Sequence, residues 1–146
     1  MNMYPSLGCL VLLSVASSMA HSATIEKPIY TQFKGSPAES NIVMGYVQFG
    51  QLADGSPAVQ KVSARKVRFF TRIVFPKMGG NDSLYSAEEL DCISGQMNFI
   101  GLGVNSTERI TAIDDAPAPQ SVVDTNAKNH PVYREVCSSL DIAPKF

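Results

Sequence analysis

The chain has 146 residues but no tryptophan, only two histidines and a net charge of −1. His21 and His130 are far apart in the sequence, so they specify no metal site. A charge so close to zero gives no general attraction to nucleic acids or acidic membranes. The glycines form no phosphate-binding loop before a helix, and no nucleophile–base–orienter set is present. The sequence therefore predicts a non-enzymatic protein without metal or cofactor.

Long hydrophobic runs are also scarce, and only residues 4–20 form one. This run contains no charged residue and ends in Ser18-Met19-Ala20, a small-x-small sequence typical of a secretory signal peptide. A membrane anchor is the alternative, but a full span needs about 20 apolar residues. We predict a signal peptide over 1–20, with cleavage after Ala20 or after Ala23. The mature chain would then be exported and have no transmembrane span.

Three cysteines are present, and Cys9 would leave with the signal peptide. Cys92 and Cys137 would remain as a pair in an oxidising compartment. Such a pair is most simply a disulfide, which leaves no thiolate to act as a nucleophile.

Residues 21–40 are rich in Pro, Gly, Ser and charge. We predict an extended, poorly packed N-terminal segment here, with a short strand near Ile29–Phe33. Residues 41–146 are long enough for one domain with its own core. Within them, 41–50 is rich in β-branched and aromatic residues and predicts a strand, and 53–57 has turn chemistry.

Residues 65–75 give the clearest periodic signal. Val67, Phe69, Thr71, Ile73 and Phe75 alternate with Arg68, Phe70, Arg72 and Val74. Period two with one mostly apolar face predicts a half-buried strand.

Residues 84–104 predict one strand, or two broken by glycine, with a bulge at Ser94-Gly95. Glu88 and Glu89 are adjacent on this strand, so their side chains are predicted to point to opposite faces. Short strands are expected at 107–113 and 121–123, separated by a rigid Pro-containing loop.

The last element changes period. Val132, Val136 and Leu140 recur every four residues, with Tyr133 and Cys137 beside them. This apolar stripe predicts a short helix. It begins with Asn129 or His130 before Pro131, and Pro144 is expected to stop it.

The order of RKVRFFTRIVF, SLYSAEELDC, TERITAIDD and HPVYREVC resembles the surface-adhesin protein E family of Gram-negative bacteria. The resemblance covers residues 42–140 and rests on short motifs: Tyr85-Ser86, Glu89-Leu90-Asp91-Cys92 and Val136-Cys137. It implies an α+β fold, an antiparallel sheet of about five or six strands with one short C-terminal α-helix packed on it and tied by the Cys92–Cys137 disulfide. It also implies an exported protein of the periplasm or outer cell surface that binds host matrix or serum proteins.

Half of the basic residues lie in one acid-free stretch between Asp54 and Asp82: Lys61, Arg65, Lys66, Arg68, Arg72 and Lys77. One hypothesis is a patch that binds an acidic protein or polyanion partner. The other is a solvated sheet face whose charges prevent edge aggregation. For the whole protein, the resemblance favours an adhesin-like binding protein. The alternative is a periplasmic accessory or inhibitor protein, such as a lysozyme inhibitor or a subunit of an envelope complex.

Overall fold

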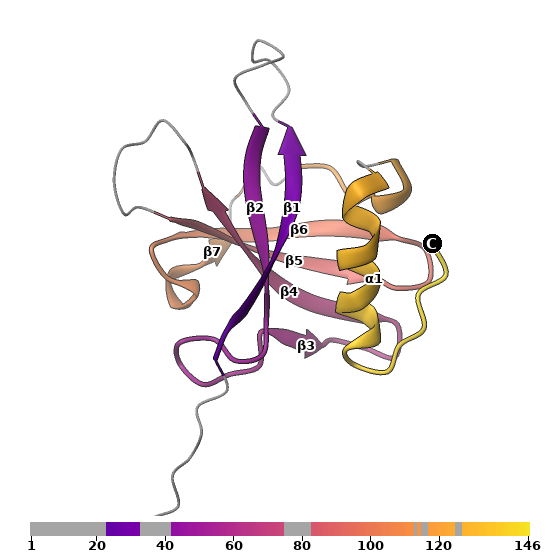
Figure 1. Ribbon diagram of the computed structural model, residues 1–146, viewed down its shortest axis with the longest axis horizontal. Coiled ribbons are helices and arrows are strands. Elements are labelled where there is room, and N and C mark those ends of the chain that lie inside the picture. Colours follow the sequence, from indigo (N-terminus) through magenta and orange to yellow (C-terminus); the bar gives the residue numbers. More distant parts are fainter. Residues whose placement is uncertain (1–22, 33–41, 75–82, 113, 115–116, 125–126) are drawn as a thin grey trace, which may run out of the picture.

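The computed structural model describes residues 23–32, 42–74, 83–112, 114, 117–124 and 127–146. It is an antiparallel sheet with one short C-terminal α-helix packed on it (Figure 1), so the predicted α+β fold is confirmed. The predicted signal peptide and Lys77 lie outside the described residues. Within the described residues, no helix has the length and apolar character to cross a membrane.

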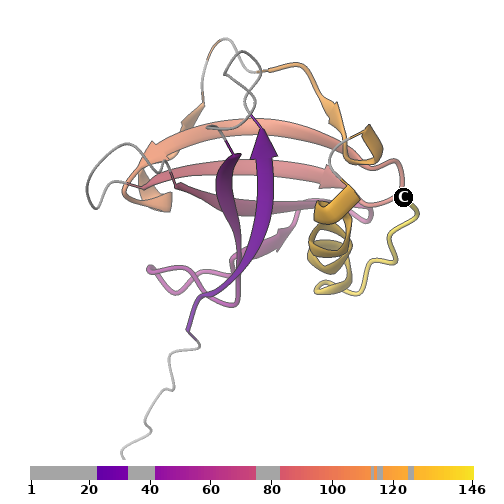
Figure 2. The same ribbon diagram turned by 45° about the horizontal axis from the view of Figure 1, so that its top comes forward.

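The sheet has the strand order β1-β2-β4-β5-β6-β7, with β3 paired to β4 and β8 paired to β6. The strands are β1 (Ile25–Gln32), β2 (Ile42–Phe49), β3 (Val59–Lys61), β4 (Lys66–Val74), β5 (Leu84–Asp91), β6 (Gln96–Val104), β7 (Thr111–Ala112) and β8 (Gln120–Ser121). In the part of the chain that the structure describes, three 3-10 turns precede α1 (His130–Ser138): η1 (Thr107–Arg109), η2 (Val122–Asp124) and η3 (Ala127–Asn129). The sheet is strongly curved: the β1–β2 hairpin crosses β4, β5 and β6 at a steep angle, with α1 beside it (Figure 2).

The main core lies between α1 and the sheet. Its most buried side chains come from five elements: Ile29, Val47, Val67, Phe69, Leu90 and Val136. Tyr133 of α1 packs on Phe69, with ring centroids 6.0 Å apart. The stripe predicted for the helix is confirmed, since Tyr133, Val136 and Cys137 are its buried residues.

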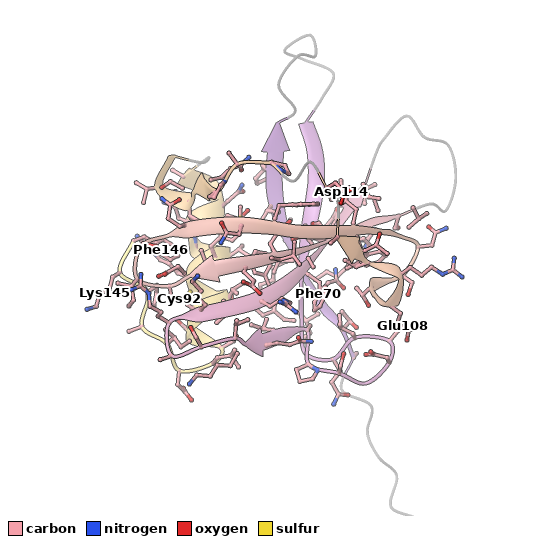
Figure 3. The ribbon with its side chains drawn as sticks, turned by 180° about the vertical axis from the view of Figure 1, so that it is seen from behind. Phe70, Cys92, Glu108, Asp114, Lys145 and Phe146 are labelled. Atoms are coloured by element: carbon pink, nitrogen blue, oxygen red, sulfur yellow. A yellow bond between two sulfur atoms is a disulfide. The ribbon has the colours of Figure 1, made fainter. Side chains whose placement is uncertain are left out.

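The opposite face of β4 is also covered in its middle. Phe70 is 9% exposed and packs with Leu52, Ala58 and Ala87 in a second, smaller cluster. Figure 3 shows this face, with α1 behind the sheet. The alternation predicted for β4 is correct, but the picture of a single buried face was incomplete because the loop after β2 folds back over Phe70.

β5 and β6 form a hairpin, so the second of the two alternatives for 84–104 is the observed one. The predicted bulge at Ser94-Gly95 is wrong, because these residues belong to the connecting turn. Gly95 has φ 71°, and the Asp91 carboxylate accepts hydrogen bonds from the N–H groups of Ile93 and Ser94. The register shift in this hairpin lies between Ala87 and Glu88 instead.

The segments after β6 are shorter strands than predicted. The expected strand 107–113 is largely replaced by η1, and only Thr111–Ala112 pairs with β6. Val122 and Val123 likewise lie in η2 rather than in a strand. β6 can accept β7 so closely because Gly101 has no side chain: a Cβ there would lie 2.3 Å from the carbonyl oxygen of Thr111.

β1 is an edge strand that begins at Ile25, earlier than the strand predicted near Ile29–Phe33, of which Phe33 lies outside the described residues. It pairs with β2 over its whole length, and Ile29 is only 2% exposed. Asn129 covers part of its free edge, since its amide exchanges hydrogen bonds with the Tyr30 N–H and C=O at 2.8 and 2.7 Å. Pro28 and Tyr30 are two residues apart, so their backbone groups point to the same side of the strand. That side is the one away from β2, where the N–H that proline lacks is not needed for sheet pairing.

The helix ends before Pro144, contrary to the prediction. The Asp141 N–H donates to the Ser138 carbonyl and the Ile142 N–H to the Cys137 carbonyl. With Asp141 at φ 57°, these are the two hydrogen bonds of a Schellman motif. The Cys92–Cys137 disulfide then ties α1 to the β5–β6 turn, as predicted.

Candidate functional site: the cationic end of the β3–β4 hairpin

The structure brings four of the six predicted basic residues to one end of the sheet. Lys61 ends β3, Arg65 lies in the turn, and Lys66 and Arg68 begin β4. Cross-strand pairing sets Gln60 opposite Arg68 and Lys61 opposite Val67. The four residues therefore share one hairpin end, with Lys61 on the other face of the sheet from Lys66 and Arg68. We call Lys61, Arg65, Lys66 and Arg68 the cationic end.

Arg72 does not belong to this group. Its guanidinium makes two hydrogen bonds of 2.7 Å to Glu26 on β1 and stacks 4.8 Å from the ring centre of Tyr46 on β2. The hydrogen bond from Arg72 is the main reason that the pKa of Glu26 is lowered. Arg72 therefore joins three strands, and a planar guanidinium suits that role. We assign it to the sheet and not to a partner surface.

Two arginines of the cationic end stand above acids that are more buried than they are. The side chain of Arg65 is 53% exposed and that of its partner Asp91 is 8% exposed, with Nη2 and Oδ2 2.6 Å apart. Arg68 pairs in the same way with Glu89, at 39% and 16% exposure. Solvent and partners therefore meet the guanidinium groups first.

Asp91 is held firmly in its ionised form. Burial favours its protonated state, but hydrogen bonds from Arg65 and from the Ser94 and Ile93 N–H groups outweigh burial and lower its pKa to about 2. The side chain that orients Arg65 thus also shapes the β5–β6 turn.

The cationic end keeps a positive excess. It has four cations, whereas the two acids paired with them are Asp91 and Glu89. Lys61 and Lys66 make no ion pair with any described residue, and Lys61 is exposed. An excess of one sign on an exposed edge attracts groups of the opposite sign.

A fifth cation lies nearby that no sequence pattern indicated. The N–H of Cys92 donates to the carbonyl of Arg65, and the carbonyl of Cys92 accepts from the N–H of Lys145 at 2.9 Å. The C-terminal tail thus brings the exposed Lys145 next to the hairpin end (Figure 3). Only the return of the tail after α1 creates this neighbourhood.

Comparison of the chain with models of protein families, with curated proteins and with solved structures found no match in any of the three. The resemblance to the surface-adhesin protein E family therefore stays a prediction. Among the described residues, no three His, Cys, Asp or Glu side chains are grouped so that they could hold a metal ion.

Proposed function

We propose that the protein is an exported, non-enzymatic binding protein that holds an acidic partner at its cationic end. The observation that carries this proposal is the layered ion pairing, with guanidinium groups outward and carboxylates beneath. Paired arginines are held in place before binding, so less side-chain entropy is lost when a carboxylate or sulfate approaches. Lys61 and Lys66 add charge that no described acid neutralises.

The resemblance to surface-adhesin protein E supports host matrix or serum proteins as partners. An exported protein with the same surface could instead serve in the periplasm as an accessory or inhibitor protein. Protease treatment of intact cells separates the two locations: digestion supports surface display, and protection supports the periplasm.

The binding experiment should remove charge without exposing a buried acid. Lys61→Gln with Lys66→Gln does this, whereas replacing Arg65 or Arg68 would leave Asp91 or Glu89 unpaired. Arg109→Gln is the matched control, because Arg109 is exposed on η1 and makes no ion pair in the described chain.

Heparin and immobilised matrix proteins are suitable probes. We expect the double lysine variant to elute from heparin at lower salt and to bind matrix protein more weakly, because exposed charges act over about 10 Å at moderate salt. Arg109→Gln should elute like the wild type. Equal elution of the double lysine variant and the wild type would refute the cationic end as the binding surface.

A further inference from the structure

Glu88 points away from the cationic end and into the side of the sheet that carries α1. As predicted, it and Glu89 face opposite sides: Glu89 pairs with Arg68, while Glu88 lies opposite Phe69 of the core. Its carboxylate accepts hydrogen bonds from Ser86 Oγ at 2.6 Å and from Thr71 Oγ1 at 3.1 Å. No cation of the described chain pairs with it.

A small pocket opens beside this carboxylate. Its volume is about 100 Å³, and its described lining is Glu88, Met97, Phe99, Pro117, Ala118 and Gln120. One water needs only about 10–15 Å³ on such a measure, so there is room for a ligand of several heavy atoms. The lining combines the Glu88 carboxylate and the Gln120 amide with four apolar residues.

We propose that this pocket binds a primary alkylammonium group, with the ammonium on the Glu88 carboxylate and the alkyl chain against Met97 and Phe99. Each carboxylate oxygen already accepts one hydroxyl donor and has a lone pair left for the ligand. Glu88 is half-buried, and a charged donor is favoured because a carboxylate withdrawn from solvent is costly unless a cation compensates it. The site is independent of the cationic end.

The groups around Glu88 make binding depend on pH. Burial raises the pKa of Glu88, and the hydrogen bonds from Ser86 and Thr71 only partly oppose this. From α1, Tyr133 is the titratable neighbour, and its pKa is raised by burial and by the charge of Glu88, so it stays a neutral phenol. An ammonium needs the ionised carboxylate. Binding should therefore release a proton, and affinity should rise with pH until free Glu88 is ionised.

The test is an NMR titration of the Met97 methyl signal with n-butylammonium, and with butyramide as a neutral ligand of similar shape. We expect a saturable shift with the amine only, and tighter binding at about pH 8 than at about pH 5. Titration with N-acetyl-lysine amide tests whether the ammonium group can come from a lysine side chain. If both amines bind, the ligand class includes lysine side chains of a partner protein. If only butylammonium binds, the ligand class is restricted to small free amines.

Three variants make the test specific. Glu88→Gln should weaken amine binding about tenfold or more, the loss expected for one charge-assisted hydrogen bond. Glu89→Gln is the matched control on the opposite face and should bind like the wild type. Ala118→Leu fills the pocket from an exposed position and should abolish binding without disturbing the core. Amine binding that survives both Glu88→Gln and Ala118→Leu would overturn the proposal, as would the absence of any amine-specific shift in the wild type.

A stability measurement checks the ionisation of Glu88 separately. Because its folded pKa lies above its unfolded value of 4.5, the wild type should lose stability as pH rises through the folded pKa. The free energy of unfolding of Glu88→Gln should lack this decrease. Measured by urea titration, it should rise relative to that of the wild type as pH increases from acidic to slightly alkaline values. Parallel curves for the two proteins would show that the pKa of Glu88 is not raised in the folded protein.

Discussion

The disulfide between Cys92 and Cys137 closes a loop with a sequence separation of 45 residues. For a loop of this length, the chain-entropy relation gives a stabilisation of about 4 kcal/mol, mainly through the unfolded state. Small domains have a net stability of only about 5–15 kcal/mol. We therefore expect loss of this bond to remove a large part of the free energy of unfolding.

The structure indicates which variant measures the bond most cleanly. Both cysteines are fully buried, so serine would leave an unsatisfied hydroxyl in the core. Cys92→Ala with Cys137→Ala avoids that defect but leaves some empty volume. Reduction of the wild-type protein breaks the bond while keeping both sulfur atoms. Comparing the two separates the loss of the link from the loss of packing.

We expect both forms to unfold at much lower urea concentration, with a loss of about 4 kcal/mol and a fall in Tm of roughly 12–20 °C. α1 has nine residues, too few to be stable alone in water, so helical circular dichroism should fall in the same transition. If both forms stayed within about 1 kcal/mol of the oxidised wild type, the entropic reasoning would be refuted. Tyr133, Val136 and Ile142 would then hold the helix by packing alone.

Three further changes probe local features. Asp91→Asn should cost about 1–2 kcal/mol after allowance for the exposure of Arg65. Because the folded pKa of Asp91 is about 2 against 3.8 unfolded, urea titrations should show this cost at neutral pH and its disappearance as pH falls towards 2. Gly101→Ala should lower the free energy of unfolding by about 1–3 kcal/mol, because the new methyl group would push β7 away from β6. Gly55→Ala should cost only about 1 kcal/mol of backbone strain, because nothing lies within 4 Å of a Cβ there. Equal losses for the two variants would contradict this reasoning. Asp141→Gly should raise stability by up to about 1 kcal/mol, because Asp141 sits at φ 57°, and a loss of stability would argue against the helix end described above.

The parts of the fold that follow from local periodicity could be predicted from the sequence. Alternation in β4 identified Val67 and Phe69 as core residues. The repeat of apolar residues every four positions in α1 identified Val136. The disulfide was expected from the count of cysteines and from the prediction that the chain is exported. Each of these signals is set by neighbouring residues or by composition, so no tertiary contact was needed to read it.

The candidate site could be predicted only in outline. Whether a basic residue belongs to it depends on ion pairs with residues that are far away in the sequence. Arg72 and Arg68 look equivalent in the sequence, yet Arg72 is bound by Glu26, 46 residues away. The glycine in Ser94-Gly95 is compatible with a bulge as well as with a turn. The hydrogen bonds that the Asp91 carboxylate accepts and the positive φ of Gly95 show that it is a turn. Glu88 and Glu89 were correctly expected on opposite faces, but the surroundings of Glu88 depend on α1 and on the segment 117–120.

Cys92 connects the stability of the fold to the cationic end, and this gives the disulfide a functional consequence. Its backbone bonds both Arg65 and Lys145, while its sulfur holds α1. Breaking the disulfide should loosen the tail that carries Lys145, while Tyr133 and Val136 keep α1 packed on the sheet. The Arg65–Asp91 and Arg68–Glu89 pairs rest on the pairing of β4 with β5, so they should persist while the sheet remains folded. Reduced protein should therefore still bind heparin, but elute slightly earlier, by about the contribution of one lysine. Complete loss of binding from reduced protein whose sheet is intact would mean that α1 or the tail, and not the cationic end, forms the principal contact.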